Sequence, residues 1–380
     1  MIVHLLRIER FLNYAVDYFE EANPGNNTYY FICGKDRPAI RPDIEGKVEI
    51  IEKDSAQYQN LLDNCGKYDI FIFHSLQKDF FPIIDRIPEN KTLCWIIFGM
   101  ELYGNFNALE KNIYLPDTKR FYRYSKTGII NYFKPYYRNL TGELDNERKY
   151  LKYFKRMTHL AAFVTNLYDI LRDLGVTQLK YIKFGYYSIE DTVGNQLFDK
   201  YAEGEDVFLG NSATFSNNHL DALHSLKDIP LGNRRLVVPL SYGNQEVVKK
   251  VTSQGRKLFG DAFVPLLDYL SREEYNQWLL SCKFVIMNFL RSQGRGNVLS
   301  ALWLGAKVFL QEEFSYFQEF RNMGIKVFSM KEFDNPGEDV FSPLTPDEMK
   351  SNRDILWTYF NRKEMVKHTR NLVKELYTQN

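Results

Sequence analysis

The clearest candidate for chemistry is a glycine-rich turn with two arginines. It reads RSQGRGN over residues 291–297 and joins an apolar strand-like run to an apolar helix-like run. The spacing predicts Asn297 as the N-cap of that helix, whose first N–H groups and positive dipole end favour an anion. Arg291 and Arg295 carry planar cationic groups that suit phosphate. The turn therefore predicts a diphosphate site, the alternative being a glycine-rich turn with solvated arginines.

A second loop rich in small polar residues follows another apolar run. It reads GNSATFSNNHLDAL over residues 210–223, with Ser216 or Asn217 as the expected N-cap of the next helix. Its place after a strand favours contact with a sugar or phosphate over a plain capped turn. Tyr242 lies beside a glycine at the next strand end, where its ring would stack on a ligand or else pack in the core.

Further polar residues stand at the ends of the neighbouring predicted strands. Asp268 precedes a helix with Ser271 as its expected N-cap, so the loop either reads a base or is an ordinary capped turn. The residues expected to bind the ligand are Gly210, Asn211, Ser212, Tyr242, Asp268, Asn288, Arg291, Gln293, Gly294, Arg295, Gly296, Asn297 and Glu312.

Two residues in the first half of the chain are candidates for a general base. Glu101 follows the apolar run 92–98, and His74 follows the run 69–73. Either group at a strand end would accept a proton from an attacking hydroxyl if its pKa lay near the working pH. A carboxyl or imidazole at such a position is more often a buried structural residue.

Several classes of protein are excluded by missing motifs. No dinucleotide GxGxxG or phosphate-loop GxxxxGK[ST] follows a predicted strand, and there is no DxD pair or zinc-like histidine spacing. We therefore expect no metal and no cofactor, with arginines and helix dipoles neutralising a diphosphate. The four cysteines form no CxxC pair, which favours a reducing compartment. No signal peptide and no long apolar span is evident, so we expect a cytoplasmic protein, soluble or peripheral on the inner face of the cell membrane.

The elements that must position these residues alternate between strand-like and helix-like patterns. This rhythm predicts an α/β fold of two Rossmann-like doubly wound domains that bind ligands beyond the carboxyl ends of their strands, in a cleft. We expect an N-terminal domain over 1–188, a linker over 189–204 and a C-terminal domain over 205–350. A C-terminal helix over 351–380 would pack back on the first domain.

A basic and aromatic stretch interrupts the first half. Residues 119–138 contain six Lys or Arg, seven Phe or Tyr and no acid, although the whole chain has a net charge of +1. Over 119–156 this pattern suits an anionic membrane surface or another anionic acceptor. It also resembles single-stranded nucleic-acid binders, which the near-neutral total charge disfavours. The plain alternative is a solvated basic face with core aromatics.

Three long segments resemble a known family. They are VFLGNSATFSNNHLDAL (207–223), LVVPLSYGN (236–244) and FVIMNFLRSQGRGNVLSALWLGAKVFLQEEFSYFQEF (284–320). They resemble the TDP-N-acetylfucosamine:lipid II N-acetylfucosaminyltransferases, the 4-alpha-L-fucosyltransferase family or glycosyltransferase family 56. The resemblance implies a GT-B fold, with a nucleotide-sugar bound by residues 210–212, Tyr242 and 293–297, and a lipid-linked acceptor facing the first domain.

Together the motifs and this resemblance imply a metal-independent glycosyltransferase. It would move a deoxy-amino or related hexose, such as N-acetylfucosamine or fucose, from a nucleoside diphosphate to a glycan in bacterial surface polysaccharide synthesis. That glycan would be carried on undecaprenyl diphosphate or would be another glycan acceptor. The alternatives are a GT-B-like sugar-nucleotide epimerase and a non-catalytic scaffold of a polysaccharide-assembly complex.

Overall fold

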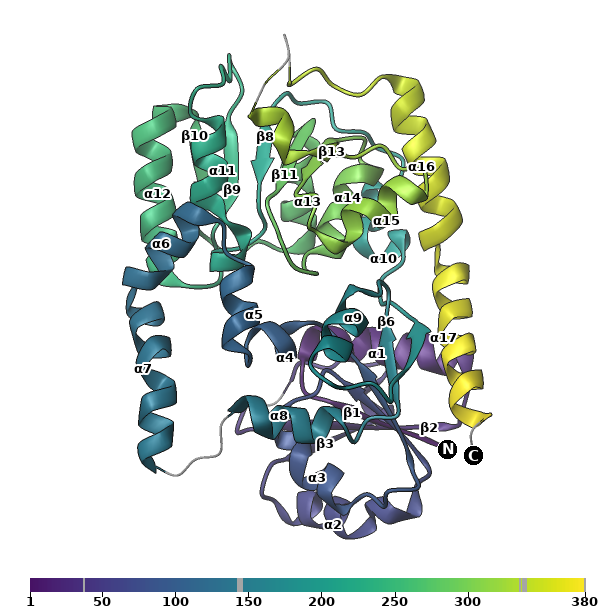
Figure 1. Cartoon of the computed structure of the whole chain (residues 1–380). Helices are drawn as coiled ribbons and strands as arrows, with labels where there is room; N and C mark the ends of the chain where they lie inside the picture. Colours follow the sequence, from purple (N-terminus) through teal and green to yellow (C-terminus); the bar gives the residue numbers. More distant parts are fainter. Residues whose placement is uncertain (37, 142–145, 335, 337–339, 379–380) are drawn as a thin grey trace. The chain divides into compact units, whose positions relative to one another are not determined.

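The chain folds into two α/β units, each built on one parallel sheet (Figure 1). The computed structural model describes residues 1–36, 38–141, 146–334, 336 and 340–378. Within these residues, unit 1 takes 1–106, 146–187 and 362–378, and unit 2 takes 107–141 and 188–361. Two doubly wound α/β units are the fold class expected from the alternating pattern, which is confirmed.

Unit 1 has a seven-stranded sheet in the order β3-β2-β1-β4-β5-β6-β7 among its described residues. The strands are β1 (Ile2–Leu6), β2 (Asn27–Cys33), β3 (Val48–Glu52), β4 (Ile70–His74), β5 (Thr92–Ile96), β6 (His159–Ala162) and β7 (Lys180–Lys183). The helices are α1 (Glu9–Ala22), α2 (Ala56–Asn64), α3 (Phe81–Arg86), α4 (Met100–Tyr103), α8 (Asn146–Phe154), α9 (Asn166–Asp173) and α17 (Arg362–Tyr377). Every residue of β4 and β5 is buried, as parallel strands covered on both faces require.

Unit 2 has a six-stranded parallel sheet in the order β10-β9-β8-β11-β12-β13 among its described residues. The strands are β8 (Val207–Leu209), β9 (Leu236–Pro239), β10 (Phe263–Leu266), β11 (Phe284–Met287), β12 (Lys307–Leu310) and β13 (Phe328–Ser329). The helices are α5 (Asn107–Asn112), α6 (Pro116–Tyr124), α7 (Lys126–Thr141), α10 (Ile189–Val193), α11 (His219–Leu226), α12 (Gln245–Phe259), α13 (Arg272–Leu280), α14 (Arg295–Trp303), α15 (Ser315–Asn322) and α16 (Pro346–Phe360).

The expected linker over 189–204 folds instead as part of unit 2. Ser188 accepts a hydrogen bond from Asp191 N while the Asp191 carboxylate accepts one from Ser188 N, and this reciprocal cap starts α10. Trp303 Nε1 then donates to the carbonyl oxygen of Phe198 (2.8 Å), which ties the rest of the stretch to α14. The glycines and polar residues of this stretch are therefore turns within a packed region.

The C-terminal stretch forms two helices where one was expected. The chain is extended at Asn361, between α16 and α17. Helix α16 belongs to unit 2, whereas α17 belongs to unit 1 and packs against α1. Leu372 and Leu376 of α17 are fully buried in the same core as Phe19 of α1.

The largest departure from the expected domains is the segment 107–141, which belongs to unit 2 although unit 1 segments flank it in the sequence. Asp221 of α11 accepts hydrogen bonds from the backbone N–H groups of Asp117 (2.8 Å) and Thr118 (3.0 Å) at the start of α6. Glu246 of α12 does the same for Lys126 (2.8 Å) and Thr127 (3.1 Å) at the start of α7. Carboxylates at helix N-termini are stabilised by the free N–H groups and the dipole.

Candidate functional site

The glycine-rich turn lies at the carboxyl end of β11 and runs into α14. The helix starts at Arg295, with Gly294 in the left-handed conformation (φ 61°) as its N-cap, so the expected cap at Asn297 is wrong. Val298 N donates to Gly294 O (3.1 Å), the first turn of the helix. The backbone N–H groups of residues 295–297 therefore have no carbonyl to bond within the helix, and helix starts of this kind favour an anion.

The loop after β8 lies against this turn. Gly210 has φ 72°, and a β-carbon there would lie 2.6 Å from Nε2 of His219, so only glycine fits. A β-carbon on Gly294 would lie 3.2 Å from Nδ2 of Asn211, which puts the Asn211 amide beside the start of α14. The next helix begins after Asn218, which has φ 51°, and neither Ser216 nor Asn217 is its N-cap.

Side-chain amides join the two loops. Ser216 Oγ donates to Gln293 Oε1 (2.8 Å), and Gln293 Nε2 donates back to Ser216 O (3.2 Å). Asn218 Nδ2 donates to Asn288 O (3.1 Å), and Asn288 Nδ2 donates to Asn218 O (3.0 Å). These paired bonds fix the separation of the two loops.

Asn288 therefore holds the loops and cannot contact a ligand, contrary to its expected role. Its side chain is 1% exposed, and its Oδ1 accepts a hydrogen bond from Gln311 Nε2 (2.6 Å). Sequence reasoning missed its partner Asn218, which is completely buried. It named the equally buried Asn217 only as an N-cap, whereas the Oδ1 of Asn217 accepts from Asn211 N (3.0 Å). The signal for both was the run Ser-Asn-Asn directly after a strand and loop.

The two arginines lie near each end of the turn and are both partly buried. The charge of Arg291 acts on Tyr114, where it opposes the rise in the tyrosine pKa that burial causes. The charge of Arg295 acts in the same way on Tyr316 of α15. The cationic groups therefore lie in partly dry surroundings, where an ion pair with phosphate is stronger than in water.

The remaining expected residues lie farther along the carboxyl edge. Tyr242 is 50% exposed after β9, and its carbonyl oxygen accepts from Ala213 N (2.8 Å). Asp268 is exposed after β10, two strands from β8, or roughly 10 Å at the usual strand spacing. Glu312 is exposed after β12 and forms an ion pair with Lys331 (2.6 Å), which with Ser329 lowers the pKa of its carboxyl. Its charge is thus turned towards β13, away from the expected ligand.

His74, one expected base, is buried in unit 1. Asn27 Oδ1 faces His4 Nε2 (3.2 Å), His4 Nδ1 faces His74 Nε2 (3.0 Å), and His74 Nδ1 faces the Tyr186 hydroxyl. Burial, and to a lesser degree His4, hold the pKa of His74 well below its ordinary value. A ring that is 1% exposed with both nitrogens bonded in the interior does not reach an acceptor hydroxyl, so the geometry contradicts this assignment.

Glu101, the other candidate, is also buried, at 2% exposed. Its Oε1 accepts hydrogen bonds from Leu76 N (3.1 Å), Trp95 Nε1 (3.2 Å) and Phe98 N (3.4 Å), so it joins the loops after β4 and β5. Burial raises the pKa of Glu101, and hydrogen bonds that include those from Trp95 and Leu76 partly oppose the rise. Its Oε2 bonds to no described residue. A role as base would need these loops to open, and it stays a prediction.

The basic and aromatic stretch is divided between the two units. Tyr150 and Tyr153 of α8 are buried in unit 1 against Phe81, as the plain reading expected. On α6 and α7 of unit 2, by contrast, Tyr132 is 76% exposed and Phe133 is 59% exposed. Residues 142–145 lie outside the described part of the chain, and the side chains of 134–141 are not described.

In the ranges that the structure describes, no three His, Cys, Asp or Glu side chains gather where they could hold a metal ion. None of the described helices combines the length and the apolar character needed to cross a bilayer.

Comparison with known proteins gives one family and a set of similar folds. The family model described as 4-alpha-L-fucosyltransferase, glycosyl transferase group 56, matches residues 154–336. The chain is similar to the Anabaena protein HepE in complex with UDP-glucose, with 12% identity and a TM-score of 0.66 over 99% of each chain. It is similar to sucrose-phosphate synthase from Thermosynechococcus elongatus, with 10% identity and a TM-score of 0.63 over 100% of this chain and 99% of that one. It is also similar to a glycosyltransferase from Rickettsia africae, with 10% identity and a TM-score of 0.59 over the same shares. The fold is GT-B.

Proposed function

We propose that the chain, whose residues 154–336 match the family model of glycosyl transferase group 56, is a nucleotide-sugar glycosyltransferase that transfers a deoxyhexose to a lipid-linked glycan. The sugar would be fucose or N-acetylfucosamine, and the acceptor a hydroxyl of a glycan on undecaprenyl diphosphate in bacterial surface polysaccharide synthesis. The 4-alpha-L-fucosyltransferase description of the family supports the sugar. The complex of the similar HepE with UDP-glucose supports a nucleoside-diphosphate donor.

The observation that carries this proposal is the meeting of two loops at the start of α14. The start of α14 after Gly294 and the Asn211 amide lie side by side at one end of the sheet of unit 2, and Arg291 and Arg295 belong to the same turn. The diphosphate would lie here, its charge balanced by the helix and the arginines, without a metal. Because negative charge grows on the leaving diphosphate in the transition state, groups fixed at this point lower the barrier to transfer.

The experiment is a transfer assay with a matched arginine control. Arg295→Ala removes a cation at the proposed diphosphate site, whereas Arg256→Ala removes one from the exposed side of α12. Loss of one preorganised electrostatic group usually costs about 10²–10³ in kcat. We expect that loss for Arg295→Ala and the wild-type rate for Arg256→Ala, with TDP-N-acetylfucosamine or GDP-fucose as donor. Full activity of a folded Arg295→Ala protein would contradict the proposed site, and an inactive wild type with every donor would favour the scaffold.

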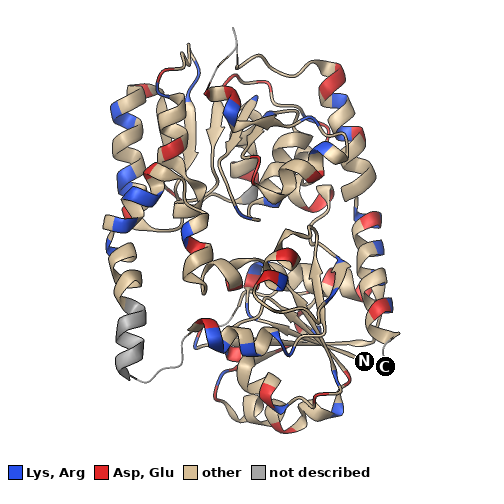
Figure 2. Ribbon diagram, in the orientation of Figure 1, with Lys and Arg blue, Asp and Glu red and all other residues tan. Residues whose placement is uncertain are grey.

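We further propose that α6 and α7 contact an anionic membrane surface where the lipid-linked acceptor lies. Lys119, Arg120, Arg123 and Lys126 are exposed, and Figure 2 shows the basic residues along α6. Exposed Tyr and Ile side chains accompany them, such as Tyr124 (72%) and Ile130 (54%). Aromatic rings favour the interface, and each basic residue adds about 1 kcal/mol near anionic lipid.

Vesicle flotation tests this surface. Alanine at Lys119, Arg120 and Arg123 together should weaken binding to phosphatidylglycerol vesicles by about 3 kcal/mol, or roughly a hundredfold. The control replaces three exposed basic residues of α12, at positions 249, 250 and 256, and should bind as the wild type does. Equal losses in both triple variants, or a wild type that never floats, would refute the membrane contact.

A further inference from the structure

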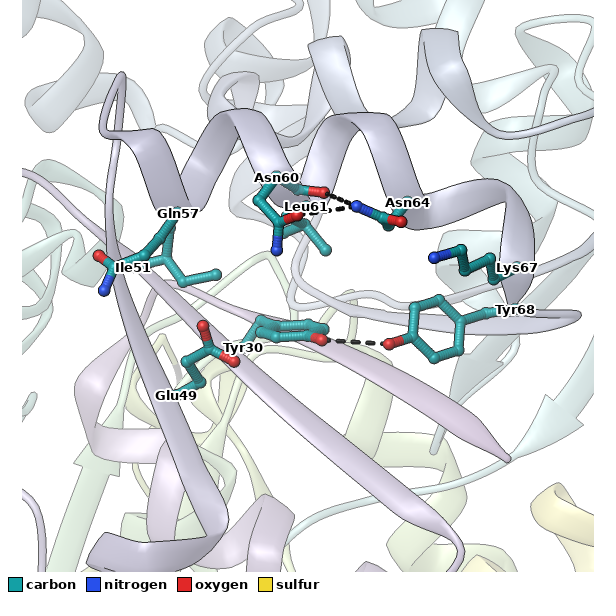
Figure 3. Close-up of a pocket in the computed structure, with 9 residues that line it drawn as sticks. All are labelled: Tyr30, Glu49, Ile51, Gln57, Asn60, Leu61, Asn64, Lys67 and Tyr68. Atoms are coloured by element: carbon teal, nitrogen blue, oxygen red, sulfur yellow. Dashed lines mark hydrogen bonds between the residues drawn. The ribbon is translucent and has the colours of Figure 1, made fainter.

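Unit 1 contains a polar pocket between helix α2 and the β2–β3 edge of its sheet (Figure 3). Its volume is about 300 Å³, at the small end of ligand pockets. Tyr30 and Ile51 come from the strands, and Asn60 and Leu61 come from the helix. Neither of the expected base residues lines it. The pocket is therefore separate from the strand ends considered above.

The helix face above this pocket is more polar than a helix that packs on a sheet requires. Leu61 is buried there, but Asn60, Gln57 and Asn64 also line the space. Asn64 Nδ2 donates to both the backbone oxygen (2.9 Å) and Oδ1 (2.8 Å) of Asn60. With its oxygen engaged in this way, Asn60 keeps its amide N–H groups as donors for another partner.

Two tyrosines form the opposite wall. The hydroxyls of Tyr30 and Tyr68 lie 3.2 Å apart, and Figure 3 shows the Tyr30 hydroxyl directed at Tyr68. Burial, followed by this hydrogen bond, raises the pKa of Tyr30, so its hydroxyl stays neutral. The rings offer apolar faces, while the joined hydroxyls can still bond at the rim.

The two ends of the pocket differ in hydrogen-bonding character, with an acceptor at one end and a donor at the other. Figure 3 shows Glu49 at one end and Lys67 at the other, with Gln57 beside Glu49. Within the described residues, the side chains of these three make no hydrogen bond or ion pair. The carboxylate accepts hydrogen bonds, the ammonium donates them, and the amide does both.

We infer that this pocket binds one neutral sugar ring through the Tyr30 and Tyr68 side chains, the carboxylate of Glu49 and the amides of α2. A pyranose has apolar C–H faces for the tyrosine rings and adjacent hydroxyls that both donate and accept. A phosphate is a poor match, because the single lysine is balanced by Glu49. The assignment of this sugar to the acceptor glycan rests on the proposed function. The inference that the pocket binds a sugar does not.

Saturation-transfer NMR tests the pocket with the methyl β-glycosides of glucose, galactose, mannose and N-acetylglucosamine. Glu49→Gln and Gln57→Ala change lining side chains that are exposed, so the fold should survive, as unchanged unfolding temperatures would show. The matched controls are Glu52→Gln on the same strand and Gln59→Ala on the same helix, neither of which lines the pocket. We expect at least one glycoside to bind, with a Kd about tenfold higher in each pocket variant, or roughly one hydrogen bond.

The outcomes separate this inference from the proposed function. If no glycoside binds to the wild type, or if the controls lose as much affinity as the pocket variants, the pocket does not bind sugar. In that case sugar transfer from a nucleotide donor, measured on the same samples, would leave the proposed function standing. Sugar binding that the pocket variants weaken, in a protein without transferase activity, would support the pocket and refute its assignment to an acceptor.

Discussion

Replacing Gly294 with alanine tests whether the start of α14 depends on its close contact with the neighbouring loop. Gly294 has φ 61°, where alanine costs about 1–2 kcal/mol. The new β-carbon would also lie 2.8 Å from Cε2 of Phe289, which is completely buried, and carbon atoms prefer about 3.5–4.0 Å. Overpacking of this kind costs about 1–3 kcal/mol. The expected total is a loss of about 2–5 kcal/mol in the free energy of unfolding of unit 2.

Gly232→Ala is the control, because Gly232 also has φ 61° but its β-carbon would meet only Arg234 Nη1, at 3.7 Å. Gly232→Ala should lower the free energy of unfolding only by the cost of the left-handed backbone, about 1–2 kcal/mol. Urea unfolding followed by tryptophan fluorescence reports mainly unit 2, which holds Trp278, Trp303 and Trp357. Calorimetric titration with UDP, TDP and GDP should show affinity lost only in Gly294→Ala. Equal destabilisation of both variants, or unchanged nucleotide affinity in Gly294→Ala, would refute the reasoning.

Two further substitutions test carboxylates that hold the fold together. Asp221→Ala removes the cap of α6 and should cost about 1–2 kcal/mol and speed proteolysis within residues 113–126, whereas the exposed Asp228→Ala should do neither. Because burial raises the pKa of Glu101 above its ordinary value of 4.5, the wild type should lose stability relative to Glu101→Gln as pH rises from 4.5 through the raised pKa. The control is Glu52→Gln, whose unfolding temperature should run parallel to that of the wild type across this pH range. If the unfolding temperatures of Glu101→Gln and the wild type also run parallel, this view of Glu101 is wrong.

The positions of the strands were predictable because buried parallel strands have a simple sequence signature. The apolar run at 284–289 marks β11 (Phe284–Met287), and the run at 69–73 marks β4 (Ile70–His74). Since parallel strands all end at one edge of a sheet, the small polar residues after them were also predictable as neighbours. This is why the turn at 291–297 and the loop at 210–212 were found together.

The details of the caps were not predictable, because they depend on backbone conformation and distant partners. Residue type favours Asn297 as an N-cap, but the chain turns three residues earlier through the left-handed Gly294. Helix α6 is capped by Asp221, which is 104 residues from Asp117 in the sequence. No local pattern reveals such a partner, so the segment 107–141 was assigned to the wrong unit.

The direction of a side chain was equally hidden from the sequence. Glu101 and His74 do stand at strand ends, as expected. Both point inward, where Glu101 binds backbone N–H groups and His74 completes a chain of buried rings. A carboxyl or imidazole at a strand end has the same residue type whether it faces solvent or the interior, and only the packing of the flanking loops decides.

The route of the chain through the two units has a consequence for its synthesis and for attempts to cut it apart. Between residues 106 and 362 the polypeptide changes unit four times, and α17 is the last piece of unit 1 to leave the ribosome. Until then Phe19 and its neighbours in α1 lack Leu372 and Leu376, which bury them in the finished protein. The amino-terminal half therefore emerges with part of its apolar face uncovered until α17 follows. A clean separation of the units would require joining three pieces of chain for one and two for the other.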